Sequence, residues 1–167
     1  KHIKKMLAIC WGMQVAVTAA GGEVKKGVNG SHIGIAKNIE LTSEGLDSFF
    51  YKDKKSKFNS PAFNFDEVVR TPDKAIHLAS NEINKIQGLH FQSGISEIWG
   101  IQYHPEITYE KMIKIIKFRK DRLINQRNRF KDEDEVYNHI DLIEKEIKIS
   151  EKNSRMIELR NWLDLIA

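Results

Sequence analysis

"KKMLAICWGMQVAVTAAGG", residues 4–22, joins an apolar run to a stretch of small residues and carries the only cysteine of the chain. Residues 4–9 are short and apolar, which predicts a buried strand. Residues 12–20 predict a helix, and the glycine pair 21–22 is suited to cap its C-terminus. The chain is therefore expected to turn sharply from a strand into a helix at Cys10.

A turn of this kind is the place where a nucleophile elbow exposes its side chain at the carboxyl edge of a sheet. A cysteine there lies at a helix N-terminus, whose partial positive charge and free N–H groups stabilise a thiolate. The backbone N–H of Trp11 is then placed to donate to an oxyanion, and Gly12 is expected to leave room for a close approach of helix to strand. The alternative interpretation is that Cys10 is only a small buried apolar residue.

A thiolate nucleophile needs a general base, and His104 is the best placed of the six histidines. It directly follows the strongly apolar run 98–103, which predicts a buried strand, and Pro105 prevents that strand from continuing. Glu106 falls on the same side of an extended backbone, within reach of the imidazole. A parallel strand ending there would share the carboxyl edge with Cys10. A Cys-His-Glu triad is therefore expected.

The rest of the chain separates into an α/β front and a helical back. The predicted strands occupy residues 33–41, 75–80, 86–92 and 98–103. From Tyr109 onward there is neither proline nor glycine, and apolar residues recur at helical spacing, which predicts two or three amphipathic helices. We expect a domain at residues 1–118 and a helical C-terminal extension at residues 119–167 that packs on it.

The composition limits the class of protein. One cysteine in 167 residues excludes an internal disulfide framework and fits a reducing, cytoplasmic compartment. No run reaches the roughly 18 apolar residues that span a bilayer, so no membrane partner is expected. Much of the net charge of +4 lies in YKDKKSKF, residues 51–58, which is interpreted as a solvated basic loop rather than a phosphate-binding patch. No nucleic-acid partner is expected either.

Three segments, ICWGMQ (9–14), AGG (20–22) and WGIQYHPEIT (99–108), resemble the class I glutamine amidotransferases. They are similar above all to the amidotransferase domain of GMP synthase. The resemblance implies an α/β fold, a three-layer sandwich around a mostly parallel sheet. It also implies a cysteine that attacks the side-chain amide of L-glutamine, forms a γ-glutamyl thioester and releases ammonia without a cofactor. The implied nucleophile, general acid/base and orienting carboxylate are Cys10, His104 and Glu106.

The resemblance also assigns residues around the triad, and the chain departs from it in places. Trp11 is expected to supply one oxyanion N–H, and Gln14 and Gly12 to bind the substrate. Ala8 stands where the family usually has glycine, and Asn64 where close relatives often have histidine. The family has several strands and helices before the elbow, including a glycine-rich loop that donates the second oxyanion N–H. An N-terminally truncated chain is therefore expected.

Two other functions stay open. A γ-glutamyl hydrolase or related thiol hydrolase would use the same scaffold, although Gln14 favours free glutamine. A non-catalytic regulatory homologue would bind a partner through its helical tail, although the retained triad argues against it. No P-loop sequence and no metal-ligand spacing is visible. An ammonia-accepting synthetase would then be a separate chain, and no metal site is expected.

Overall fold

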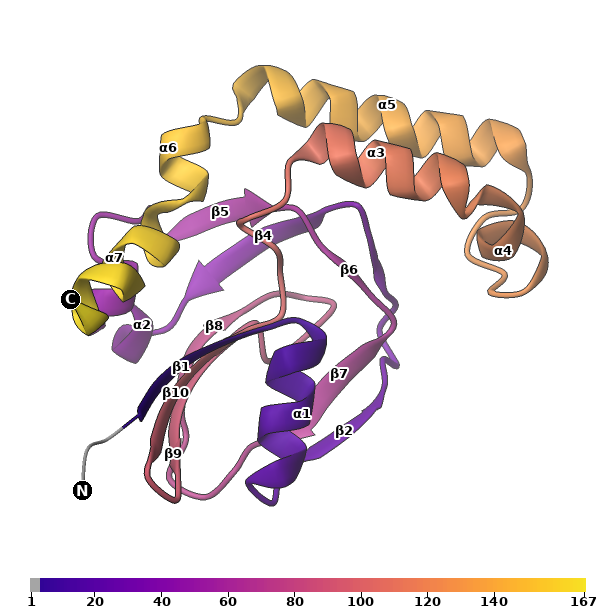
Figure 1. Ribbon diagram of the computed structural model, residues 1–167. Helices are drawn as coiled ribbons and strands as arrows, with labels where there is room; N and C mark the ends of the chain where they lie inside the picture. The colour runs from indigo at the N-terminus through magenta and orange to yellow at the C-terminus, as the bar shows by residue number, and fades with distance from the viewer. Residues whose placement is uncertain (1–3) are drawn as a thin grey trace.

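The computed structural model describes residues 4–167 and shows a mixed sheet with helices on both faces (Figure 1). The main sheet has six strands in the order β1-β10-β9-β8-β4-β5, and β2–β7 and β3–β6 form two small sheets. The strands are β1 (Lys4–Ile9), β2 (Glu23–Lys26), β3 (His32–Ile33), β4 (Ala36–Leu41), β5 (Lys57–Ser60), β6 (Phe63–Asn64), β7 (Asp66–Arg70), β8 (Ile76–Ser80), β9 (Gly88–Ser93) and β10 (Ser96–Ile101). The helices are α1 (Trp11–Ala19), α2 (Ser43–Asp47), the 3-10 helix η1 (Phe49–Tyr51), α3 (Tyr109–Phe118), α4 (Lys120–Asn125), α5 (Glu133–Ile149), α6 (Lys152–Arg155) and α7 (Ile157–Ile166).

The α/β class is confirmed, but the main sheet is not mostly parallel. β1 pairs in parallel with β10, starting with Lys4 opposite Ser96. The other neighbouring pairs of the main sheet are antiparallel. The physical reason is the length of the connections. Only Gly94 and Ile95 join β9 to β10, whereas a parallel pair needs a crossover of about a dozen residues or more.

Helix α1 covers one face of the sheet. Its buried Met13 and Val17 pack in one core cluster with Phe91 of β9. Helix α1 comes close to β10 at Gly100, where a Cβ would lie 2.6 Å from Met13 Cγ. The expectation that Gly12 makes this room was wrong, because a Cβ at Gly12 would meet no atom within 4 Å.

The opposite face is covered by η1 and α7. Phe50 and Tyr51 of η1 pack there with Trp99 of β10, and Trp162 and Leu165 of α7 pack against the same cluster. In Figure 1, α7 lies at one end of the molecule, where it contacts η1. The C-terminal helix therefore closes the core on this side of the sheet.

Helices α3, α4 and α5 share a further core cluster with β3, and Figure 1 shows α3 and α5 lying along each other. Gly34 lets these helices approach β3 closely, because a Cβ there would lie 2.6 Å from Ile143 Cδ1. Gly34 has a φ of 86°, a backbone conformation that interrupts the predicted strand 33–41 and divides it into β3 and β4. The expectation that the helical tail packs on the α/β front is confirmed.

The basic segment 51–58 is not solvated throughout, as it was expected to be. The side chain of Lys54 is 2% exposed, and its Nζ lies 2.7 Å from Oε2 of Glu158, whose side chain is 0% exposed. The two residues are 104 positions apart. A buried charge is tolerated when it is paired and hydrogen-bonded, but a partner so distant gives no local signal in the sequence.

Local boundaries agree well with the predictions near the elbow. The predicted strand 4–9 is β1, and the predicted helix 12–20 is α1, which begins at Trp11. The strands β2, β5 and β7 were not predicted, because they are short and carry many polar residues. No helix within residues 4–167 is long and apolar enough to cross a membrane.

Candidate active site

Cys10 occupies the turn between β1 and α1 as an elbow residue. Its φ of 53° and ψ of −110° place it in a strained region for a residue with a side chain. Its backbone N–H donates to the carbonyl of Ile101 at 2.7 Å, and its own carbonyl accepts from the N–H of Gln14 at 3.1 Å. Bonds on both sides of the turn hold the strained conformation, so that the thiol lies at the carboxyl edge of β1.

The thiol of Cys10 lies beside polar groups that come from three parts of the chain. The side-chain Nε2 of Gln102 donates to Cys10 Sγ at 3.5 Å. The Sγ in turn lies 3.9 Å from the carbonyl of Phe63. Gln14 Nε2 donates to Gln102 Oε1 at 3.2 Å and to the carbonyl of Asp66 at 3.0 Å. Cys10 is therefore not a buried apolar residue but a partly exposed thiol among polar groups.

Gln102 is a site residue that the sequence interpretation missed. It is fully buried and connects the expected nucleophile to Gln14. One signal was available, because Gln102 is a polar residue in the apolar run 98–103 and lies two positions before His104. In an extended strand, positions i and i+2 point to the same side.

His104 and Glu106 are joined as expected. His104 Nδ1 lies 2.7 Å from Glu106 Oε1, with side chains that are 18% and 38% exposed. The backbone N–H of His104 donates to the carbonyl of Pro61 at 2.7 Å, and the N–H of Ile107 donates back to the His104 carbonyl at 3.2 Å. These bonds fix the segment that follows β10 in a tight turn, which brings the carboxylate to the imidazole.

The charge state of His104 depends on its partners. Burial lowers the pKa of His104, but the hydrogen bonds to Cys10 and to Glu106, together with their charges, outweigh burial and raise it to about 9. The imidazole is consequently protonated at neutral pH, between a sulfur and a carboxylate. Cys10 and His104, which are 94 positions apart in the sequence, thus lie close enough for the sulfur to influence the charge of the imidazole.

The N-terminus of α1 provides a donor next to the sulfur. Trp11 is the first residue of α1, so its backbone N–H has no acceptor within the helix. The indole of Trp11 is 74% exposed and leaves this end of the helix uncovered. Gly12 follows with open space in front of it. The arrangement can place an oxyanion against the helix N-terminus.

A buried polar network lies next to Phe63 in the chain, around Asn64. Asn64 Nδ2 donates to the carbonyl of Asp66 and to Asn84 Oδ1, both at 3.0 Å, and Asn84 Nδ2 donates to Glu67 Oε2 at 3.1 Å. Asn64 Oδ1 itself is buried and has no hydrogen-bond partner in the described part of the chain. Asn64 thus occupies a polar, structurally constrained position.

His32 belongs to the same buried region. Burial lowers the pKa of His32 to about 4, so its ring is neutral and accepts a hydrogen bond from Gln87 Nε2 at 2.9 Å. This histidine lies in β3 and is 1% exposed. A neutral, bonded ring supports the fold rather than acid–base chemistry.

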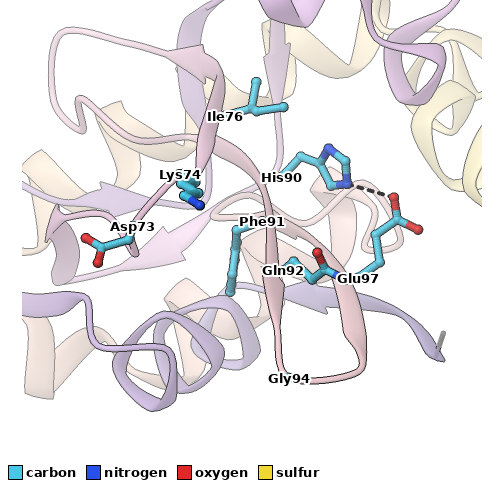
Figure 2. Close-up of a pocket in the computed structure, with 8 residues that line it drawn as sticks. All are labelled: Asp73, Lys74, Ile76, His90, Phe91, Gln92, Gly94 and Glu97. Atoms are coloured by element: carbon cyan, nitrogen blue, oxygen red, sulfur yellow. Dashed lines mark hydrogen bonds and ion pairs between the residues drawn. The ribbon is translucent and has the colours of Figure 1, made fainter. Parts of the chain in front are cut away.

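A separate hollow of about 580 Å³ lies at the β9–β10 hairpin (Figure 2). His90 Nε2 lies 3.1 Å from Glu97 Oε1 beside this hollow, and Figure 2 shows the bonded pair. None of the residues around Cys10 lines the hollow. Within residues 4–167, no group of three or more His, Cys, Asp or Glu side chains is arranged to hold a metal ion.

Comparison of the amino-acid sequence with known proteins places the chain in a family. The family model described as "Glutamine amidotransferase class-I" matches residues 2–120. The chain is 32% identical, over an alignment of 182 residues, to a gamma-glutamyl-L-1-hydroxyisopropylamide hydrolase from a Pseudomonas species. It is also 32% identical over 106 residues to a glutamine-hydrolyzing GMP synthase subunit of Methanosarcina acetivorans.

The shares of each chain that match are unequal. The alignment with the Pseudomonas hydrolase covers 95% of this chain and 60% of that protein, and the alignment with the Methanosarcina protein covers 64% and 52%. The crystal structure of a glutamine amidotransferase from Thermotoga maritima matches with a TM-score of 0.66 at 23% identity, over 95% of this chain and 60% of that one. The chain therefore spans about half to three fifths of the length of these relatives.

Proposed function

The chain belongs to the class I glutamine amidotransferase family, and on that premise we propose that it hydrolyses the side-chain amide of glutamine to glutamate and ammonia through a cysteinyl thioester. The observation that carries the proposal is the position of His104, which is bonded to Glu106 at 2.7 Å and lies beside Cys10 at the elbow. A charged imidazole between a thiol and a carboxylate is the arrangement that activates a sulfur nucleophile.

In the first half of the reaction, the Cys10 thiolate attacks the γ-carbonyl carbon and forms a C–S bond. The developing oxyanion accepts a hydrogen bond from the N–H of Trp11. The tetrahedral intermediate then collapses, the C–N bond breaks, and the His104 imidazolium gives its proton to the departing amine, which leaves as ammonia. Glu106 holds the imidazole in the orientation for that transfer.

In the second half, a water molecule takes the place of the ammonia. Neutral His104 removes a proton from the water as its oxygen attacks the thioester carbon. The C–S bond breaks, glutamate leaves, and the thiolate–imidazolium pair is restored. Gln14 and Gly12 are proposed to contact the substrate, Gly12 because the space in front of it is open.

A second candidate substrate is a γ-glutamyl amide with a substituted nitrogen. The alignment with the Pseudomonas relative covers 95% of this chain, so it includes most of the helical extension 119–167, whereas the alignment with the Methanosarcina protein covers 64%. The Pseudomonas relative is named for the hydrolysis of a γ-glutamyl alkylamide. The same bonds would form and break, with an alkylamine in place of ammonia.

The proposal also covers the domain boundaries of the chain, its partner protein and its cellular location. Residues 1–118 would form the amidotransferase domain, and residues 119–167 the helical extension. The relatives named as GMP synthase subunits support an ammonia-accepting synthetase on a separate chain. The single cysteine supports a reducing, cytoplasmic location.

The experiment compares glutamate release from glutamine and from γ-glutamyl isopropylamide, with Cys10→Ala as the control. Turnover of either substrate that Cys10→Ala abolishes would support thiol hydrolysis at the elbow. A higher kcat/KM for glutamine supports the first candidate, and a higher kcat/KM for the alkylamide supports the second. Glutamate release that persists in Cys10→Ala would overturn both, and the absence of any turnover would favour a non-catalytic homologue.

A further inference from the structure

The turn that carries the acid–base pair is held from outside by an arginine of the C-terminal helices. The Nη1 of Arg155 donates to the carbonyl of Ile107 at 2.9 Å and to the carbonyl of Pro105. These carbonyls flank Glu106, the carboxylate bonded to His104. The guanidinium thus bridges the backbone on either side of Glu106.

Arg155 is itself fixed by buried charges. It is the last residue of α6, and Lys54 Nζ donates to the carbonyls of Ser154 at 2.9 Å and of Arg155 at 3.4 Å. The same ammonium pairs with Glu158 at 2.7 Å, at the start of α7. The side chains of this ion pair are 2% and 0% exposed, so the segment that presents Arg155 is anchored in the interior.

Glu158 of this buried ion pair also lies near Tyr103, the residue before His104. The hydroxyls of Tyr103 and Tyr51 lie 2.9 Å apart and are buried. Burial, followed by the nearby Glu158 carboxylate, raises the pKa of Tyr103. The C-terminal helices therefore support this turn on both sides, by packing of Trp162 and Leu165 against the cluster that contains Tyr103 and by the bonds of Arg155 around Glu106.

We propose that Arg155 is a positioning residue, which holds Glu106 against His104 through the carbonyls of Pro105 and Ile107. This inference rests on the proposed function, because it assigns Arg155 to the same site. Arg155 lies beyond residues 2–120, the part that the family model matches. The acid–base pair of this chain thus depends on a contact from the helical extension.

The proposal requires that Arg155 acts through Glu106 and not through the charge of His104. The groups that face His104 are Cys10 from the elbow and Glu106 from its own turn. Arg155 faces the backbone of that turn. Its charge also acts to lower the pKa of Glu110 and of Tyr109 in α3. Loss of Arg155 should therefore resemble loss of the Glu106 carboxylate.

The test is a double-mutant cycle between Arg155→Ala and Glu106→Gln, read as the pH profile of kcat/KM for glutamine and of Cys10 alkylation by iodoacetamide. We expect Arg155→Ala to lower kcat about tenfold or more, with a smaller change in KM, and to move the upper limb of both profiles to lower pH. Adding it to Glu106→Gln should have little further effect, since residues that act as a unit are not additive.

Two further variants make the result specific. Arg155→Lys keeps the charge but replaces the planar guanidinium, whose Nη1 donates to both carbonyls, by an ammonium on a different stem, so an intermediate shift is expected even if the alanine variant folds poorly. Arg160→Ala removes an arginine of the same segment that bonds to Asn153, and it should leave both profiles unchanged.

The outcomes separate the positioning role from the proposed function. Effects of Arg155→Ala and Glu106→Gln that add, or a loss of activity without a pH shift, would overturn the positioning role. Unchanged profiles in Arg155→Ala and Arg155→Lys would overturn it as well. If glutamine is not turned over but Cys10 alkylation shows the coupled shift, the proposed function fails and the positioning role stands.

Discussion

The elbow at Cys10 and the C-terminal helices around Glu158 both support the acid–base turn, but by different means. At the elbow, a strained residue is held by backbone bonds between neighbouring elements. At the C-terminal helices, a buried ion pair and one guanidinium provide the support. Backbone bonds survive most side-chain replacements, whereas a buried charge fails when its partner is removed. The second region is therefore the more sensitive to single substitutions.

The largest difference in stability is expected from breaking the buried pair. Glu158→Ala leaves Lys54 uncompensated in the interior and should cost about 3–5 kcal/mol of unfolding free energy, measured by urea denaturation. As a matched control, Glu40→Ala breaks the pair with Lys57, whose side chains are 58% and 56% exposed, and should cost less than about 1 kcal/mol. Similar losses in the two variants would mean that the C-terminal helices are not anchored by this pair.

A smaller effect separates two glycines of the elbow region. Gly100→Ala forces a Cβ to 2.6 Å from Met13 Cγ and should destabilise by about 1–3 kcal/mol through overpacking. Gly12→Ala meets no atom within 4 Å and should leave the unfolding free energy unchanged or higher, because alanine favours the helix.

The two glycine variants are compared by thermal unfolding, which gives Tm, and by substrate kinetics, which give KM. If Gly12 faces the substrate, Gly12→Ala should raise KM while Tm holds. A lower Tm for Gly12→Ala than for Gly100→Ala would contradict the packing described for α1 on β10.

The smallest effect is a shift along the pH axis. The proton of His104 is needed by the leaving amine, so kcat should fall as pH rises through about 9. In Glu106→Gln the imidazolium loses a bonded carboxylate, and this fall of kcat at high pH, the upper limb of the profile, should move to lower pH.

The raised pKa of His104 also makes the free energy of unfolding depend on pH. The stabilisation is fully present below the ordinary pKa of about 6.5 and is lost as pH rises through about 9. An upper limb that Glu106→Gln does not move would remove Glu106 from its orienting role.

Regions held by residues close together in the sequence were predicted well, and regions held by residues far apart in the sequence were not. The elbow is encoded by consecutive residues, so apolar patterning predicts β1 and α1 to within a residue. The reach of Glu106 to His104 follows from their spacing beside Pro105. Gln102 left a weaker signal, because a buried amide directly after a strand is hard to distinguish in sequence from an exposed polar residue.

The C-terminal helices lie at the other extreme. Lys54 stands in a run of lysines that is typical of an exposed loop, and its partner Glu158 is on a distant helix. Nothing local distinguishes Arg155 from the other arginines of the tail. The antiparallel pairing of the main sheet was likewise missed, because short connections such as 94–95 decide strand direction, while the expectation of parallel strands came from resemblance.

The central claim is that Cys10 is a nucleophile activated by His104. It is tested most directly by labelling with 6-diazo-5-oxonorleucine, a glutamine analogue that alkylates an activated thiol, followed by peptide mass spectrometry. We predict rapid modification of Cys10 in the wild-type chain and a strongly reduced rate in His104→Ala. No modification of Cys10, or an equal rate in His104→Ala, would contradict the claim.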